Sequence, residues 1–189
     1  MRLIIIFVIS LTISFLIFNF SFNPKFHNRI LKLDSFEKII YIDESFSESE
    51  VLLVNIAAAN WVSATNHVVK LTVIKFPTKE RNAEKALIIT KIRSLDVEEE
   101  LQVSKAFAEN MVGFYDKRSL ISHIYIVEDK LKNHEEYTAV LMHEIGHAMG
   151  LEHSSESNTL MNAEISDGSL SITYKDIQQF CSIYKCVNR

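Results

Sequence analysis

The sequence has no run rich in lysine and arginine: its 24 acidic residues outnumber the 20 basic ones, and its formal net charge is -4. Proteins that bind nucleic acid usually carry a basic patch that neutralises phosphates, so we expect no nucleic-acid partner. There is also no internal repeat and no low-complexity tract after residue 22. With 189 residues, 48% of them hydrophobic and 23% charged, the chain has the size and composition of one globular domain.

Cysteine is scarce, because Cys181 and Cys186 are the only two in the chain. Residues five apart on a continuous helix point about 140° away from each other, with Cα atoms too distant for a disulfide. A disulfide therefore requires the helix to end between them, and the sequence leaves open whether they are paired or free. Neither lies near a histidine in the sequence, so nothing marks either one as a nucleophile or a metal ligand.

Residues 1–22 differ from the rest, since Arg2 is their only charged residue and most of the others are apolar. Such a segment inserts into a membrane, either as an uncleaved anchor or as a signal peptide that is removed. Basic residues stand on both sides of it, so their count does not fix its orientation. We expect a linker at residues 23–34, a folded domain at residues 35–189, and that domain to be exported from the cytoplasm.

The remaining sequence alternates between strand and helix patterns. Five segments rich in β-branched and aromatic residues predict strands at 37–43, 68–76, 86–92, 101–107 and 121–127. A capping sequence at Ser47 opens a helix that runs to about Ala64, Asn133 can cap a second helix, and Thr173 with Asp176 opens a third. This order predicts a mixed α/β sheet domain.

The chemical signal is the stretch HEIGHAMGLEHS at residues 143–154. Residues four apart lie one above the other on a helix, so His143 and His147 can direct two imidazoles to one point. Gly150 can adopt the left-handed conformation that ends a helix and reverses the chain, which would bring His153 to the same point. Such a pattern arises by chance in on the order of one shuffled copy in 10⁵, so we predict a metal site with three histidine ligands.

Three imidazoles with an open fourth position describe a catalytic zinc site, because a structural zinc is normally closed by a fourth protein ligand. Zinc lowers the pKa of a water bound at that position toward ~7. Glu144 follows His143 and is rotated ~100° around the helix, where it can take the proton of this water. The predicted site therefore consists of His143, His147 and His153 as zinc ligands and Glu144 as catalytic base.

These residues resemble the signature of the metzincin zinc peptidases, HExxHxxGxxH followed by a methionine turn, with Met161 as the methionine. Ser154 after the third histidine, the eight-residue distance to Met161 and the final stretch SITYKDIQQFCSIY are similar to matrixins in particular. The resemblance implies a zincin-like fold: a mostly parallel five-stranded sheet with an antiparallel edge strand, an active-site helix beneath it and a small C-terminal helical part. It also implies that Met161 lies under the imidazoles as an apolar floor and not as a ligand.

The resemblance further implies that residues 103–110 are the edge strand, against which an extended peptide substrate pairs as an added strand. Several matrixin features are missing. No cysteine precedes the motif, so the thiol that blocks many matrixin zymogens is absent, and no tyrosine stands two residues after Met161 as a fifth ligand. Lys105 stands where matrixins place a histidine of a second zinc site. We therefore expect one catalytic zinc ion, and further zinc or calcium stays open.

The sequence thus predicts a monomeric zinc metalloendopeptidase that acts on proteins or peptides and is secreted or membrane-anchored, with its catalytic domain outside the cytoplasm. Two other interpretations stay open. A non-catalytic, zinc-stabilised peptide-binding module would have no need of Glu144. A zinc hydrolase of a non-protein amide or ester would have no need of an edge strand for peptides, although fold and metal alone permit it.

Overall fold

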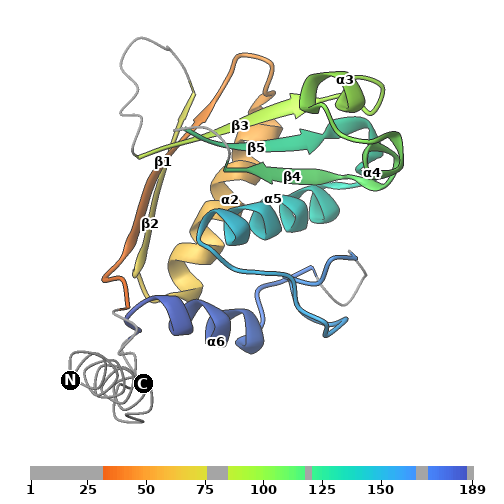
Figure 1. The fold of residues 1–189 in the computed structure, drawn as a ribbon. Coiled ribbons are helices and arrows are strands. Elements are labelled where there is room, and N and C mark those ends of the chain that lie inside the picture. The colour runs from red at the N-terminus through yellow and green to blue at the C-terminus, as the bar shows by residue number, and fades with distance from the viewer. Residues whose placement is uncertain (1–31, 76–84, 118–120, 165–169, 187–189) are drawn as a thin grey trace, which may run out of the picture. The chain divides into compact units, whose positions relative to one another are not determined.

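The computed structural model describes residues 32–75, 85–117, 121–164 and 170–186 (Figure 1). The predicted membrane segment at residues 1–22 and almost all of the predicted linker lie outside these ranges. Within the described ranges, no helix has the length and apolar character that a membrane crossing requires.

A five-stranded mixed sheet forms the upper layer of the domain (Figure 1). Its strands are β1 (Phe36–Ile42), β2 (Val69–Lys75), β3 (Ala86–Ile92), β4 (Gly113–Asp116) and β5 (Ser122–Val127). They lie in the order β2-β1-β3-β5-β4. All neighbouring pairs are parallel except β4 and β5, which are antiparallel. The prediction of a mostly parallel sheet with an antiparallel edge strand is confirmed.

The position of that edge strand was predicted wrongly. Residues 103–110 are not the edge strand and residues 101–107 form no strand, because the chain there ends helix α3 (Val97–Leu101) and forms helix α4 (Lys105–Asn110). Four apolar side chains recur here at helical spacings and are buried together in a small cluster: Val97, Leu101, Ala108 and Met111. Short apolar runs fit helix and strand patterns equally well. The actual edge strand, β4, has only four residues, all half-buried, and so leaves little trace in the sequence.

Three longer helices complete the fold: α2 (Glu48–Ala64), α5 (His134–Ala148) and α6 (Tyr174–Ile183). Helices α2 and α5 contact each other and lie beneath the sheet, where α2 contacts β2 and α5 contacts β4 and β5 (Figure 1). Their inward side chains join those of the central strands in one core that includes Trp61, Ile124 and Ile145. Burying each such side chain contributes about 1.5–3 kcal/mol.

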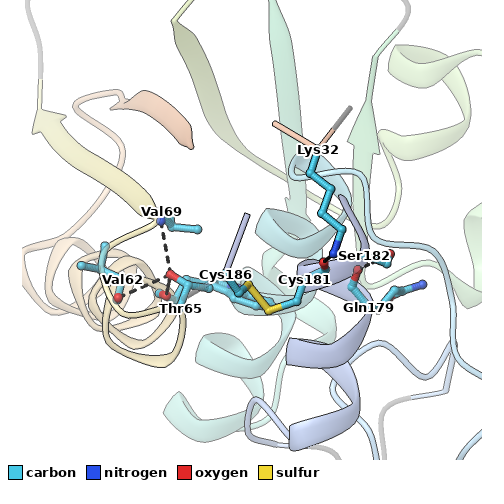
Figure 2. Close-up of a disulfide and its surroundings, with 9 residues drawn as sticks. Lys32, Val62, Thr65, Val69, Gln179, Cys181, Ser182 and Cys186 are labelled. Atoms are coloured by element: carbon cyan, nitrogen blue, oxygen red, sulfur yellow. Dashed lines mark hydrogen bonds between the residues drawn. A yellow bond between two sulfur atoms is a disulfide. The ribbon is translucent and has the colours of Figure 1, made fainter. Parts of the chain in front are cut away.

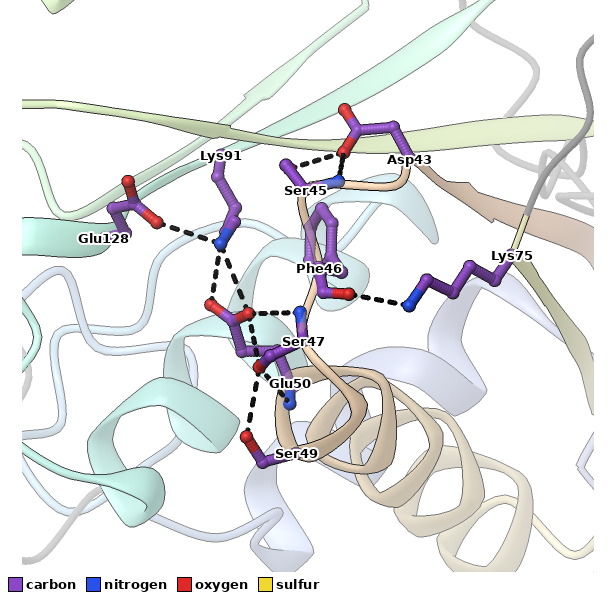
Figure 3. Close-up of polar contacts among 9 residues, drawn as sticks. All are labelled: Asp43, Ser45, Phe46, Ser47, Ser49, Glu50, Lys75, Lys91 and Glu128. Atoms are coloured by element: carbon purple, nitrogen blue, oxygen red, sulfur yellow. Dashed lines mark hydrogen bonds and ion pairs between the residues drawn. The ribbon is translucent and has the colours of Figure 1, made fainter.

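The start of α2 is tied to the sheet by polar contacts (Figure 3). Ser47 and Glu50 form the predicted capping box. The Glu50 carboxylate also accepts hydrogen bonds at 3.0 and 3.2 Å from the Nζ of Lys91 on β3. The same ammonium lies 3.0 Å from Glu128, the first residue of the 3-10 helix η1 (Glu128–Lys130) that follows β5. Lys91 thus links α2, β3 and η1.

The two ends of the described chain meet beside α6. Leu33 donates a backbone hydrogen bond to Ile183 and accepts one from Lys185, so the first residues pair with the last. Helix α6 ends at Ile183, and Cys181 and Cys186 form a disulfide across this end, with Cα atoms 5.4 Å apart (Figure 2). The helix therefore ends between the two cysteines, which is the condition that the sequence set for a disulfide.

Candidate metal centre

Helix α5 carries the first two histidines, and its C-terminal end turns the chain back toward them. Gly150 has φ +92, a conformation that favours glycine. Gly150 N–H donates to His147 O at 2.9 Å and Leu151 N–H donates to Gly146 O at 3.0 Å, the two hydrogen bonds of a Schellman motif. The reversal delivers His153 to the face of the helix that bears His143 and His147.

The three imidazoles converge on one point. The Nε2 atom of His147 lies 3.0 Å from that of His143 and 3.1 Å from that of His153. Ligand nitrogens about 2.0–2.1 Å from a zinc ion, at tetrahedral angles, are about 3.3 Å apart. The observed separations are close to this value, so the three histidines fit a zinc ion at their centre.

Backbone carbonyls fix which ring nitrogens face the metal position. The Nδ1 atoms of His143 and His147 lie 2.7 Å from Leu160 O and 2.8 Å from Leu151 O. A carbonyl can only accept, so each Nδ1 carries the proton and each Nε2 presents a lone pair. Two lone pairs 3.0 Å apart cannot form a hydrogen bond with each other, whereas a cation between them satisfies both. These carbonyl acceptors had not been identified from the sequence.

Burial keeps the histidines ready to bind metal. It lowers the pKa of His143 to about 4, against a smaller opposing effect of the hydrogen bond to Leu160, and it also lowers the pKa of His147. Metal ligation requires neutral imidazole, so burial favours the metal-binding form of both rings. His153 is the exposed member of the three.

Met161, the predicted floor, packs against helix α5 at Gly146. It is fully buried, and a Cβ atom on Gly146 would lie 2.5 Å from its sulfur. Gly146, between the two helical histidines, therefore leaves the space that Met161 fills. Trp61 of α2 lies against the same point and donates from its indole nitrogen to Met142 O at 2.8 Å, next to His143. Neither Gly146 nor Trp61 could be linked to this site from the sequence.

A buried carboxylate on α6 holds the turn that contains Met161. Asp176 is 2% exposed and accepts hydrogen bonds from the backbone N–H groups of Leu160 and Met161, both at 3.1 Å. It also accepts from the N–H and the hydroxyl of Thr173, both at 2.7 Å. Because Leu160 O in turn accepts from His143, Asp176 positions a zinc ligand through one peptide unit. From the sequence, Asp176 is predicted only as a capping residue of α6, a role that it also has in the structure.

Glu144 points to the other side of α5, toward the edge strand. It is 5% exposed, and its Oε2 atom accepts no hydrogen bond from any described residue. Burial raises the pKa of Glu144 to about 8, while a hydrogen bond from the backbone N–H of Tyr115 acts in the opposite direction. A Cβ on Gly113 would lie 2.7 Å from Glu144 Oε1, so this glycine lets β4 approach the carboxylate. A metal ion nearby would lower this pKa and favour the charged carboxylate.

The site opens into a cleft of about 570 Å³. One side is formed by residues of α4, β4 and the turn between them, which we call the α4–β4 wall (residues 106–115). The other side is formed by α5 with its histidines and Glu144, together with His153 and Ala163. The residues predicted separately as metal ligands and as catalytic base thus line one opening.

The sequence matches one protein family, and the fold is similar to that of a solved structure. A family model described as matrixin matches residues 57–185. The crystal structure of archaemetzincin from Methanopyrus kandleri is similar with a TM-score of 0.53 and 15% identity, over 78% of this chain and 94% of that one. At this identity the likeness shows the fold alone.

Two further solved structures have lower scores. Metalloproteinase-II from Bacteroides fragilis gives a TM-score of 0.47 at 12% identity, and the match covers 82% of this chain and 57% of that one. A zinc-dependent peptidase from Methanocorpusculum labreanum gives 0.46 at 12% identity, over 75% of this chain and 99% of that one. Among curated proteins, none matches the sequence.

Proposed function

The chain belongs to the matrixin family of zinc metallopeptidases, and on this basis we propose that it is an endopeptidase that hydrolyses peptide bonds of proteins bound as extended strands. The observation that carries the proposal is the convergence of three Nε2 atoms beside a buried, unpartnered carboxylate oxygen in an open cleft. His143, His147 and His153 would hold one zinc ion, which supplies a water of lowered pKa and polarises the substrate carbonyl.

Glu144 provides the proton transfer in this proposal. Its Oε2 atom is free to accept a proton from the attacking water and then to donate that proton to the leaving amide nitrogen. The other oxygen, Oε1, lies against Gly113 of β4, which limits the movement of the carboxylate while Oε2 acts. A module that only bound peptides would gain nothing from burying an unpaired carboxylate at this place, since such burial costs stability.

Strand β4 provides the substrate edge in place of residues 103–110. Val127 N–H donates to Val112 O at 3.0 Å, and in an antiparallel pair the residues that bond to the neighbouring strand alternate. Phe114 therefore bonds toward β5, and the peptide groups of Gly113 and Tyr115 face away from it. They border the cleft beside Glu144, where an extended peptide can pair with them.

The test is a cleavage assay of the full-length chain with a mixed peptide library, in which new termini are mapped by mass spectrometry. We expect internal cleavage that a chelator abolishes. Glu144→Gln should bind zinc as well as the wild type but lose at least 10³-fold in activity. Glu135→Gln, the same change at an exposed position of α5, is the matched control. If the wild type and Glu144→Gln both bind peptide and both show negligible turnover, the chain is a binding module. If it hydrolyses only non-peptide amides or esters, it is another kind of hydrolase.

We also propose that the catalytic domain works outside the cytoplasm, secreted or held by residues 1–22. The disulfide between Cys181 and Cys186 supports this, because disulfides persist in oxidising compartments. The mass of the N-terminus of the mature protein would distinguish removal of residues 1–22 from retention. Reduced cysteines in the protein isolated under thiol-trapping conditions would argue for a reducing compartment.

A further inference from the structure

Lys130 is the last residue of η1, and it inserts its ammonium group into the C-terminal end of α4. Its Nζ atom donates to Ala108 O at 2.7 Å, Glu109 O at 2.9 Å and Met111 O at 3.0 Å. An ammonium has three donors, and all three are used. The last carbonyls of a helix lack partners within the helix and carry the negative end of its dipole, so a cation there is favourable.

Two of these carbonyls belong to the end of α4, and that of Met111 lies in the junction between α4 and β4. Ala108 and Met111 are 6% exposed and belong to a small apolar cluster that also contains Val127 of β5. One residue after Met111, Val112 O accepts from Val127 N–H, and β4 begins at Gly113. Since α4 has only six residues, the ammonium and this cluster are the main described contacts that hold it in place.

Helix η1 is itself fixed firmly enough to serve as an anchor. Glu128 is paired with the half-buried ammonium of Lys91, at 3.0 Å (Figure 3). Asp129 accepts hydrogen bonds from the Ser94 N–H at 2.8 Å and the Ser94 hydroxyl at 2.5 Å. Each of the three residues of η1 thus binds a different part of the chain. A displacement of α4 away from Lys130 would have to break contacts to an immobile group.

The α4–β4 wall determines what the cleft offers to a substrate. It supplies Ala106 and residues 110–115 of the cleft lining. Gly113 of this wall lies against Glu144 of α5. A shift of this wall by an ångström would change both the width of the cleft and the direction of the peptide groups that face it.

We propose that Lys130 is a positioning residue for substrate binding: its ammonium fixes the α4–β4 wall at the distance from α5 at which Gly113 and Tyr115 can pair with an extended peptide. The inference rests on the proposed peptidase function. Lys130 itself contacts neither the substrate nor the zinc ion in this proposal. Its effect is on the strand that the substrate joins.

The test compares Lys130→Met with Lys132→Met, which removes the same charge from an exposed side chain two residues on. Both are made in the full-length chain and assayed with zinc and one peptide identified by cleavage mapping. For Lys130→Met we expect KM to rise about tenfold with kcat changed less than threefold, because binding to β4 is lost alike in ground and transition state. Hydrogen exchange should accelerate in residues 106–115 and stay unchanged in α5, and zinc affinity should stay within twofold.

Lys130→Arg is the second variant, and it keeps the proposal testable if the methionine variant does not fold. Its planar guanidinium keeps the charge but cannot direct three donors as an ammonium does, so KM should lie between the other two values. The proposal would be overturned if Lys130→Met had the same KM and the same exchange pattern as Lys132→Met. It would also be overturned if Lys130→Met lost stability and kcat without a change in KM. A wild-type chain that binds zinc but cleaves no peptide would instead remove the proposed function, and this inference with it.

Discussion

Replacing Asp176 by asparagine should destabilise the protein and weaken zinc binding, although the side chain keeps its shape. The carboxylate is 2% exposed and accepts four hydrogen bonds, three at Oδ2 and one, from Met161 N–H, at Oδ1. An asparagine serves the three donors best with its oxygen at the Oδ2 position. Its NH₂ group then faces the Met161 N–H, donor against donor.

The expected cost follows from these contacts. An unsatisfied buried donor costs about 1–3 kcal/mol, and the three remaining hydrogen bonds weaken because hydrogen bonds to a charged acceptor are roughly twice as strong as neutral ones. Removing the buried charge returns part of its desolvation cost. We therefore expect a loss of about 3 kcal/mol in the free energy of unfolding. For a domain of this size that lowers Tm by about 6–12 °C.

Zinc affinity should fall along with stability. The peptide unit between Leu160 and Met161 offers its N–H to Asp176 and its carbonyl to His143, so displacement of this unit misaligns a ligand. Losing such a supporting contact typically costs 10–100-fold in metal affinity. The assay is thermal unfolding of the zinc-saturated chain, together with competition for zinc against a chelator of known affinity.

Asp96→Asn is the matched control, since Asp96 is only half-buried and pairs with an exposed arginine at 2.9 Å. It should change the free energy of unfolding by less than about 0.5 kcal/mol. If Asp176→Asn unfolds within 2 °C of the wild type and binds zinc equally well, then the turn around Met161 does not depend on this carboxylate and the reasoning is refuted.

Three further predictions concern stability. In the metal-free protein, burial lowers the pKa of His143 from 6.5 to about 4, so the unfolded state takes up a proton at a higher pH than the folded state. Up to about 3 kcal/mol of stability should therefore be lost as pH falls from 6.5 to 4. Thermal unfolding with chelator at several pH values should show this loss, and His143→Gln should reduce its dependence on pH. Gly150→Ala should lower the free energy of unfolding by about 1–2 kcal/mol in denaturant titration, from backbone strain at its positive φ. No clash adds to this cost, since the new Cβ would be 3.5 Å from the nearest side chain, that of Ile183. An unchanged midpoint would exclude that strain. Reducing the disulfide between Cys181 and Cys186 should cost about 2 kcal/mol, and a double serine variant insensitive to reductant is the control.

The metal ligands could be predicted because their signal is local. Helical spacing places His143 and His147 together, and the conformation of Gly150 brings in His153, all within eleven residues. The helix caps at Ser47, Asn133 and Thr173 were predicted for the same reason, since each depends on a few neighbouring residues.

What surrounds the ligands could not be predicted. The acceptors for His143 and His147 are backbone carbonyls, which every residue has, so no residue type marks them. Asp176 reaches Leu160 across 16 positions, and Lys130 reaches Ala108 across 22. Contacts of this kind depend on how the elements pack, which a single sequence does not encode in its spacing.

The misplaced edge strand has the same origin. Val97, Leu101 and Ala108 face a small apolar cluster on the sheet, so tertiary burial decides for helix where a short apolar run leaves the choice open. Four half-buried residues then suffice for β4, because it pairs with β5 along its whole length.

Trp61 gives the chain a built-in optical reporter. It is the only tryptophan, it is fully buried, and its indole nitrogen is hydrogen-bonded to the residue before His143. Its emission therefore comes from one known place under the metal position. Loading with zinc, its removal by a chelator and the unfolding of α5 can each be followed in the unlabelled protein, with no background from a second indole.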